Sequence, residues 1–193
     1  TDSHNELPII LHDQKRLDSI ELYPFEKIIN SGIGSIMVAH ISLPNIDSKA
    51  QPATFSDYII KDILKNRLNF KGLVITDALN MKGAYSANLK PGEIEFNAFM
   101  AGNDILLYPS HISEAIDMIK EAYHLGLITE EEIDKRCRKI LLMKQWVGLH
   151  KNVFPQKKIN INHVQNERLE RELCKESITI LKNDSILPLN NLY

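Results

Sequence analysis

The stretch FKGLVITDALNMKG, residues 70–83, decides how the rest of the chain is interpreted. Its centre is an uninterrupted apolar run at residues 73–75, which is preceded by a glycine and followed by Thr76 and Asp77. Consecutive apolar residues are typical of a strand that is buried on both faces, as in a parallel sheet covered by helices. We therefore expect a strand over residues 72–76 that ends in the carboxylate of Asp77.

Two further runs, SIMVA at residues 35–39 and DILLY at residues 104–108, have the same apolar character and predict two more buried strands. Between the first two strands, Ser56 is placed to cap a helix whose apolar residues recur at helical spacing up to Leu68. Other helices are expected at residues 24–30, from residue 91 to about 102, from residue 113 past 123, and from the Thr129/Glu132 capping box to Trp146. This alternation predicts an α/β fold with a parallel sheet.

Composition changes after Gly148, where residues 150–165 are polar and show no sustained period. We expect residues 1–149 to be one domain and residues 150–165 to be a linker. Residues 166–193, with a helix over 167–175 and a strand over 177–181, are expected to begin a second domain.

The 193 residues carry 23 basic and 25 acidic side chains, a formal charge of -2 that does not favour a nucleic-acid partner. The two cysteines have no ligand-like spacing, so neither a disulfide framework nor a metal site is expected, and no motif calls for a cofactor. No apolar run approaches the roughly 20 residues that a membrane span requires. Because the chain begins at Thr1 in a polar stretch, we expect an internal piece of a longer protein, whose targeting signal this sequence does not contain.

Asp77 is the main catalytic candidate among the carboxylates. The carboxyl ends of parallel strands gather the loops that carry function, and Asp77 follows such a strand directly. The alternative is that its side chain only caps the following turn.

Residues 70–83 closely resemble the nucleophile segment of family 3 glycoside hydrolases of the N-acetylglucosaminidase type. Three other segments are also similar to that family: RLDSIELYPF at 16–25, MVAHI at 37–41 and AGNDILL at 101–107. The resemblance implies a (β/α)8 TIM barrel, of which this chain supplies about strands six to eight, with Asp77 as the nucleophile after strand seven. Residues 176–189 resemble the opening of the second α/β sandwich domain of two-domain members.

Residues 1–4, Thr-Asp-Ser-His, resemble the mobile loop that carries an Asp-x-His dyad in the same family. The resemblance implies that His4 is the general acid/base and that Asp2 orients it. A nearby carboxylate favours the imidazolium, which can protonate a leaving oxygen and then, as imidazole, activate water. Taken alone, the Asp2-Ser3-His4 triplet is equally typical of a solvated N-terminal strand.

Three residues are candidates for substrate binding because they lie near the expected catalytic face. His40 ends the first strand, but it could equally be a structural histidine. Asn80 and Met81 follow Asp77 closely, although a turn-forming Asn and a packing Met account for them as well.

The resemblance implies a retaining hydrolase of terminal N-acetyl-β-D-glucosaminides, acting on a glycan or a muropeptide. Alternatives are a phosphorylase, a β-glucosidase, or an inactive carbohydrate-binding fragment. The family's Lys-His pair, Gly-rich stretch and earlier sugar-binding Asp and Arg residues are not in this chain. We therefore expect the missing N-terminal half of the barrel to come from another segment or to be replaced by an oligomeric contact, and the isolated fragment to be inactive.

Overall fold

The computed structural model describes residues 2, 4–84, 89–151 and 164–184. Its internal contacts divide the chain into residues 1–151 and residues 152–193. The first unit contains the strands, and the described part of the second contains a helix.

Strands β1 (Ser35–Val38) and β2 (Leu73–Thr76) pair in parallel, with Ser35 opposite Leu73 and Val38 opposite Thr76. The helix expected between them is present as η3 (Tyr58–Arg67). Ser56 Oγ accepts a hydrogen bond from the Ile59 N–H at 3.1 Å, so this residue caps the helix. The parallel pairing and the connecting helix are confirmed.

The third expected strand, residues 104–108, is reduced to one parallel bridge between Ile75 and Ile105. Side chains replace the backbone pairing on either side of that bridge. The Asp104 carboxylate accepts from the Val74 N–H at 2.8 Å, and Thr76 Oγ1 accepts from the Leu107 N–H at 2.9 Å. The segment then turns at Tyr108, whose φ is 47°, so it lies along β2 without forming a regular ladder.

A hydrophobic core joins the two strands to η3. Its buried members come from both strands, η3, the end of α3, residue 53 and the segment before β2, and are Ile36, Val38, Ala53, Ile60, Leu64, Phe70, Val74 and Ala101. Gly72 is required at the edge of this core, because a Cβ there would collide with the Gly34 carbonyl oxygen and the Phe70 ring. The close approach explains why the apolar run begins with glycine.

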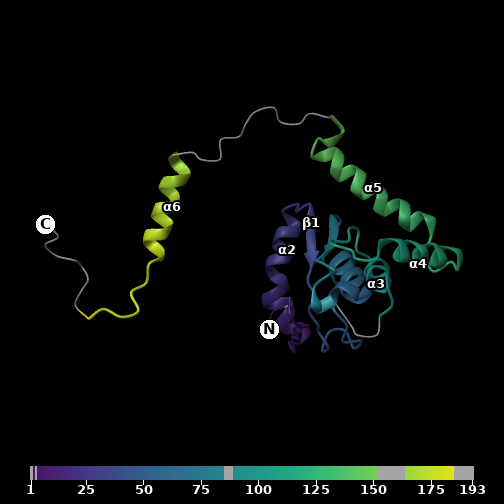
Figure 1. The fold of residues 1–193 in the computed structure, drawn as a ribbon, viewed down its shortest axis with the longest axis horizontal. Helices are drawn as coiled ribbons and strands as arrows, with labels where there is room; N and C mark the ends of the chain where they lie inside the picture. The colour runs from purple at the N-terminus through teal and green to yellow at the C-terminus, as the bar shows by residue number, and fades with distance from the viewer. Residues whose placement is uncertain (1, 3, 85–88, 152–163, 185–193) are drawn as a thin grey trace. The chain divides into compact units, whose positions relative to one another are not determined.

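The helix expected at residues 24–30 begins earlier. The segments α1 (Gln14–Arg16), η1 (Leu17–Glu21) and α2 (Leu22–Asn30) follow one another without a break, and α2 runs beside β1 in Figure 1. Asp13 starts the segment, since its Oδ1 accepts from the Arg16 N–H at 2.8 Å.

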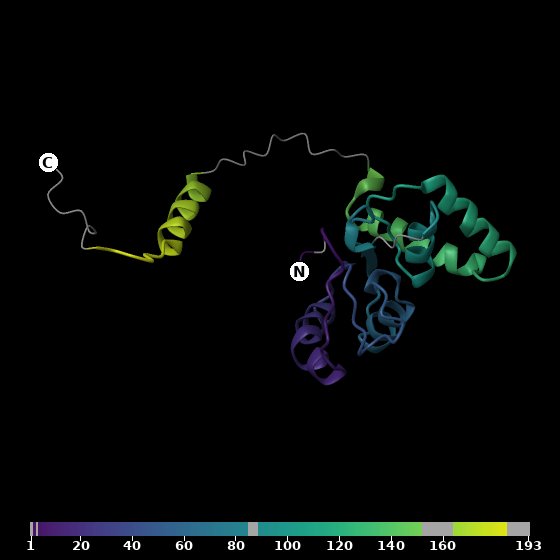
Figure 2. The same ribbon diagram turned by 60° about the horizontal axis from the view of Figure 1, so that its bottom comes forward.

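The remaining helices of this unit agree with the expected pattern. These helices are α3 (Glu93–Ala101), α4 (Ile112–His124) and α5 (Glu130–Trp146). The same unit also contains the short helical turns η2 (Ala53–Phe55), η4 (Lys82–Ala84) and η5 (Leu149–Lys151). Helix α3 ends at Gly102, and the Thr129/Glu132 capping box opens α5. Apolar side chains of α4 and α5 line a shared shallow pocket, and Figure 2 shows the two helices joined by a short turn. Helix α4 starts at Ile112, one residue before the expected Ser113.

The second unit contains α6 (Val164–Ser177), which confirms the helix expected at residues 167–175. The strand expected at 177–181 is not formed, because Ser177 is still helical and residues 178–184 have no regular structure. A strand needs a pairing partner, and α6 is the one element of this unit among the described residues. Most of the expected linker (152–163) and residues 187–189 lie outside the described residues.

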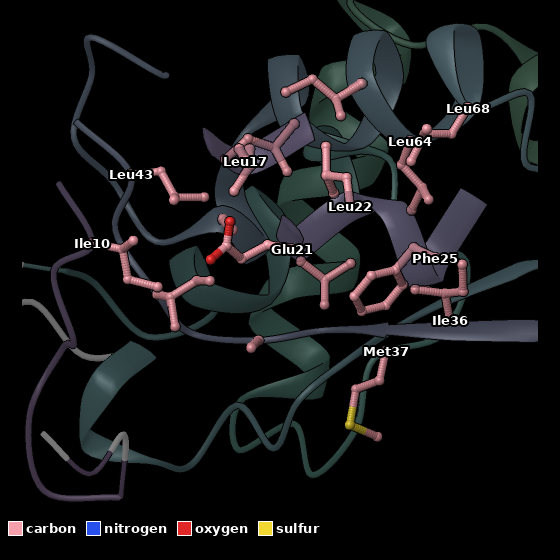
Figure 3. A pocket seen from close by; sticks show the side chains of 16 residues that line it. Ile10, Leu17, Glu21, Leu22, Phe25, Ile36, Met37, Leu43, Leu64 and Leu68 are labelled. Carbon is pink, nitrogen blue, oxygen red and sulfur yellow. The ribbon is translucent and has the colours of Figure 1, made fainter. Parts of the chain in front are cut away.

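The edge of β1 away from β2 has no strand partner in the described ranges. Beside it lies an apolar cavity of about 220 Å³ between β1, η3 and the helical segment of residues 14–30. Figure 3 shows Leu22 and Phe25 on one side of β1 and Met37 on the other, where it is 53% exposed. One carboxylate oxygen of Glu21 is buried there without a hydrogen-bond partner within the described parts of the chain. None of the described helices is long and apolar enough to cross a membrane.

Candidate active site

Asp77 lies directly after β2, at the carboxyl end of both parallel strands. Its backbone N–H donates to the Val38 carbonyl oxygen at 3.0 Å, which extends the pairing of the two strands by one residue. Buried Val74 and Thr76 anchor the strand below it. The regular part of the sheet therefore fixes the backbone of the candidate nucleophile.

The Asp77 carboxylate is half-buried and only partly engaged. Oδ1 accepts from the Ala78 N–H at 2.8 Å. Oδ2 has no hydrogen-bond partner, and no Lys, Arg or His forms an ion pair with this carboxylate, within the described residues. Capping and catalysis are thus compatible, because one oxygen stabilises the turn and the other remains available to a ligand.

His40 is fully buried and lies between the two strand ends. Its Nε2 is 3.0 Å from the carbonyl oxygen of Ala78, the residue after Asp77. Its Nδ1 is 2.8 Å from Thr54 Oγ1. Since a carbonyl oxygen can only accept, Nε2 carries a proton in this arrangement. The structure brings His40 to the nucleophile segment through the backbone, with both ring nitrogens engaged by the protein.

Thr54 is a residue that the sequence analysis missed. Its side chain is fully buried, and Oγ1 also lies 3.1 Å from the carbonyl oxygen of Ala39. Its own carbonyl oxygen accepts from the side-chain amide of buried Asn103 at 2.9 Å. The sequence contains no signal for this role, because a lone Thr in a loop that contains a Pro is common.

Asn80 and Met81 occupy different environments after the nucleophile. Asn80 is exposed, whereas the Met81 side chain is 9% exposed and packs into the protein. The Met81 N–H donates to the Ala78 carbonyl oxygen at 3.1 Å, which closes a turn directly after Asp77. Asn80 is the more accessible of the two candidates for contact with a ligand.

Asp2 and His4 form the expected pair. His4 Nδ1 is 2.7 Å from Asp2 Oδ1, and the His4 backbone N–H donates to the same oxygen at 3.0 Å. Asn5 Nδ2 donates to Asp2 Oδ2 at 3.2 Å. The pKa of Asp2 lies below its usual value, first because the His4 backbone N–H donates to it and second because the His4 ring does.

This geometry leaves His4 Nε2 as the ring atom that can exchange a proton with a ligand. Both side chains are exposed, at 74% for His4 and 59% for Asp2. No hydrogen bond or ion pair connects the dyad to Asp77 in the part of the chain that the structure describes. The structure thus brings together Asp2 with His4, and Asp77 with His40, as two separate pairs.

No group of three or more His, Cys, Asp or Glu side chains among the described residues could hold a metal ion. Residues 1–143 match the glycosyl hydrolase family 3 N terminal domain. The chain belongs to glycosyl hydrolase family 3. The N-terminal domain of this family is a TIM-barrel-like α/β fold, in agreement with the parallel strands and intervening helices described above.

Several relatives of the chain are named β-hexosaminidases. The chain is 30% identical to β-hexosaminidase A of Pseudoalteromonas piscicida over 98% of its own length and 35% of the relative's. A solved structure of a family 3 β-N-acetylglucosaminidase from Paenibacillus sp. strain FPU-7 superposes with a TM-score of 0.81 at 30% identity, over 95% of this chain and 36% of that one.

A second structural neighbour is the β-glucoside phosphorylase BglX, with a TM-score of 0.80 at 26% identity, over 97% of this chain and 36% of that one. The chain thus spans about a third of the length of these relatives. The relatives that carry the names β-hexosaminidase and β-N-acetylglucosaminidase are thus accompanied by one that is named a β-glucoside phosphorylase.

Proposed function

We propose that the protein is a retaining glycoside hydrolase that cleaves terminal N-acetyl-β-D-glucosaminides, with Asp77 as nucleophile and His4 as acid/base. The observation that carries this proposal is the half-buried Asp77, held at the carboxyl end of two parallel strands with one carboxylate oxygen unengaged. Its relatives named as β-hexosaminidases and β-N-acetylglucosaminidases support the substrate class.

In the first step, the unengaged oxygen of Asp77 attacks the anomeric carbon as the bond from that carbon to the leaving oxygen breaks. His4 Nε2 gives its proton to the leaving oxygen. In the second step, the same nitrogen takes a proton from water, whose oxygen displaces Asp77 from the sugar. Two inversions at the same carbon give net retention.

Asp2 has a supporting role in this mechanism. Its contact with His4 Nδ1 at 2.7 Å fixes the ring orientation and directs Nε2 outward. The lowered pKa of Asp2 means that it remains a carboxylate to lower pH than an ordinary aspartic acid. The dyad must approach the glycosidic oxygen to within about 3 Å for proton transfer, so the mechanism requires closure of its segment over bound substrate.

His40 supports the nucleophile through Ala78 in this proposal. Because it is fully buried with both nitrogens engaged, any contribution to substrate binding comes through the turn that follows Asp77. Asn80, which is exposed on that turn, is the candidate for direct sugar contact.

A phosphorylase is the second candidate function, favoured by the similarity to the β-glucoside phosphorylase BglX. Phosphate would replace water in the second step and yield a sugar 1-phosphate. A β-glucosidase and an inactive carbohydrate-binding fragment are the remaining candidates. Product analysis in phosphate buffer separates the first two, because free N-acetylglucosamine indicates hydrolysis and a sugar 1-phosphate indicates phosphorolysis.

The architecture that goes with this function is a barrel in which residues 1–149 supply strands six to eight and residues 166–193 begin a second domain. The unpaired edge of β1 and the apolar cavity beside it are the faces where the rest of the barrel, or an oligomeric contact, would pack. Light scattering on the isolated chain tests this need for a covering partner. A monodisperse monomer would contradict it.

The decisive experiment uses the full-length protein with an aryl N-acetyl-β-D-glucosaminide. Turnover with retention, measured by NMR of the first product formed, is expected. A 5-fluoro glycosyl fluoride should then label the peptide that contains Asp77. Labelling of another carboxylate would remove Asp77 from this role, and absence of turnover on any glycoside would favour the binding fragment.

A further inference from the structure

A second cavity lies at the other end of the strands, where β2 begins. It has a volume of about 590 Å³ and is bounded by η3, the start of β2, the loop after α3, and α5. Six cationic side chains line it, and we call it the cation pocket: Lys61, Lys65, Lys71, Lys135, Arg136 and Lys139.

The charge of the cation pocket is unlike that of the chain as a whole, which is formally -2. Only two carboxylates line it, Asp104 and Glu132, so the six cations leave an excess of four positive charges. Asp104 is neutralised by Lys139 at 2.7 Å, and Glu132 is engaged in the capping box of α5. The excess is therefore not balanced by the residues that line the cavity.

Three of the cations have structural partners that account for their presence. Lys65 Nζ donates to the Gly102 carbonyl oxygen at 2.5 Å, and Lys139 Nζ donates to the Gly72 carbonyl oxygen at 2.9 Å. Arg136 donates to the carbonyl oxygen of Phe99 at 2.6 Å and stacks over its ring. These contacts satisfy carbonyl groups where α3 ends and β2 begins.

The other three cations are not needed for those contacts. Lys61 and Lys71 have no hydrogen-bond or ion-pair partner anywhere in the described ranges, and Lys135 pairs with Glu131 on α5 at 2.8 Å. Carbonyl capping alone therefore explains only half of the positive charge that gathers here.

Two groups at the cavity are incompletely compensated. The pKa of Lys65 is lowered to about 8, chiefly because burial disfavours its charged form; the Asp104 carboxylate raises this pKa, and repulsion from Lys139, Arg136 and Lys61 lowers it. The Asp104 side chain is 1% exposed, yet its Oδ1 has no hydrogen-bond partner among the described residues. A ligand that brings negative charge into the cavity would offset the repulsion among its cations.

We propose that the cation pocket binds a phosphate-bearing small anion. Several lysine ammonium groups around one guanidinium are suited to phosphate, which accepts hydrogen bonds on all its oxygens and carries up to two charges. Free phosphate and a phosphate ester share this chemistry, and the titrations below distinguish them.

This site is separate from the proposed catalytic carboxylate. Lys71, which lines the pocket, and Asp77 are six residues apart on either side of β2, which corresponds to roughly 20 Å at the usual rise of a β-strand. A phosphate in the pocket cannot reach a sugar carbon held at Asp77. The inference therefore stands whether or not Asp77 is the nucleophile, and it does not favour phosphorolysis.

Isothermal titration calorimetry of the full-length protein tests the proposal, with inorganic phosphate, pyrophosphate and glucose 6-phosphate as probes. The double variant Lys61→Met/Lys71→Met removes two cations that make no contact within the described structure. We expect it to weaken binding at least tenfold. The matched control is Lys15→Met/Lys120→Met, which changes charge equally on residues outside the pocket and should bind like the wild type.

Proton uptake provides an independent readout. If the anion lies beside Lys65, binding near pH 8 raises the protonated fraction of this amine, so the observed enthalpy depends on the ionisation enthalpy of the buffer. Lys65→Met should abolish that dependence. The charges that face Lys65 are those of Lys61, Lys139, Arg136 and Asp104, and the first three increase the uptake.

The outcomes separate the possible ligands. Tighter binding of glucose 6-phosphate than of inorganic phosphate identifies an ester site, and the reverse identifies a free-phosphate site. Equal weak binding of phosphate, sulfate and chloride indicates an adventitious ion only and overturns the proposal. It is also overturned if Lys61→Met/Lys71→Met binds like the control, or if an oligonucleotide binds more tightly than every phosphate probe.

Discussion

The two ends of β2 carry different kinds of chemistry. At its carboxyl end, a single carboxylate, Asp77, is positioned by backbone hydrogen bonds and by a fully buried histidine. At its amino end, six cations surround a cavity and half of them make no contact that the fold requires. Bond formation needs one atom at a defined place, whereas attraction of an anion needs only net charge within a few ångströms. In the two proposals above, one short strand thus supports both kinds of site at opposite ends.

The largest effect is expected from removal of the nucleophile. In the full-length protein, Asp77→Ala should lower the rate of glycoside cleavage by about 10⁴-fold or more, since the covalent step is lost. Circular dichroism and the binding of anions should remain those of the wild type. A tenfold effect or less would place the reacting carboxylate elsewhere. The carboxyl end of β2 would then not carry the chemistry that sets it apart from the amino end.

His4→Ala should have the next largest effect, and its size should depend on the substrate. Cleavage of natural glycosides, whose leaving groups are poor, should slow by about 10² to 10⁴-fold, because they need a proton as they depart. Dinitrophenyl glycosides should lose far less in their first step. Stopped-flow measurement of the released phenol on a series of aryl glycosides checks this. Equal losses across the series would mean that His4 is not the general acid.

His40→Ala tests whether the buried histidine acts through Ala78. It removes two hydrogen bonds and leaves a cavity, so the free energy of unfolding should fall by about 2 to 4 kcal/mol. Below the new melting temperature, kcat should fall about tenfold or more while KM changes little, because the carboxylate and not the sugar site is displaced.

Thr54→Val is the control for His40→Ala, since it removes the contact to Nδ1 but retains the contact between Nε2 and Ala78. It should lower stability by about 1 to 2 kcal/mol with little change in kcat. If both variants lose stability and neither changes kcat, His40 supports the fold alone.

The smallest effect concerns pH and the amino end of the strand. The pKa of Lys65 is about 8 in the folded chain, below its usual 10.5. Between these values the unfolded chain keeps the proton that the folded chain has lost, so the free energy of unfolding rises with pH in this range. Urea titrations at pH 7.5 and 9.5 should show this rise in the wild type and a smaller one in Lys65→Met. Parallel profiles would mean that the pKa of Lys65 is not lowered in the folded chain.

Local sequence signals predicted the helices and the parallel pairing well. The capping box at Thr129, the cap at Ser56 and the apolar runs of β1 and β2 each depend on neighbouring residues only. The third strand was wrong in its extent, because Asp104 and Thr76 use side chains to satisfy backbone groups that a ladder would have paired. A pattern of apolar residues contains no information on where side chains take the place of backbone groups as hydrogen-bond partners.

The candidate site was predicted unevenly for the same reason. Asp77 and the Asp2/His4 pair belong to short motifs, and the structure places Asp77 after β2 and His4 beside Asp2, while their catalytic roles remain predictions. The contact between Thr54 and His40 was missed, and so was the cation pocket. In both cases the residues are far apart in sequence and come together only in the folded chain. The roles of His40, Asn80 and Met81 as ligand-binding residues remain predictions.

The open edge of β1 sets a limit on how the isolated chain can be handled. Its backbone groups, which have no strand partner among the described residues and lie next to exposed Met37, can accept a strand from any neighbouring copy. Growth from such an edge is a nucleated process, so its rate rises steeply with protein concentration. We expect the yield of soluble chain, relative to the yield in inclusion bodies, to depend on how long the edge of β1 stays unpaired during synthesis. The melting temperature of the chain should have a smaller influence on that yield.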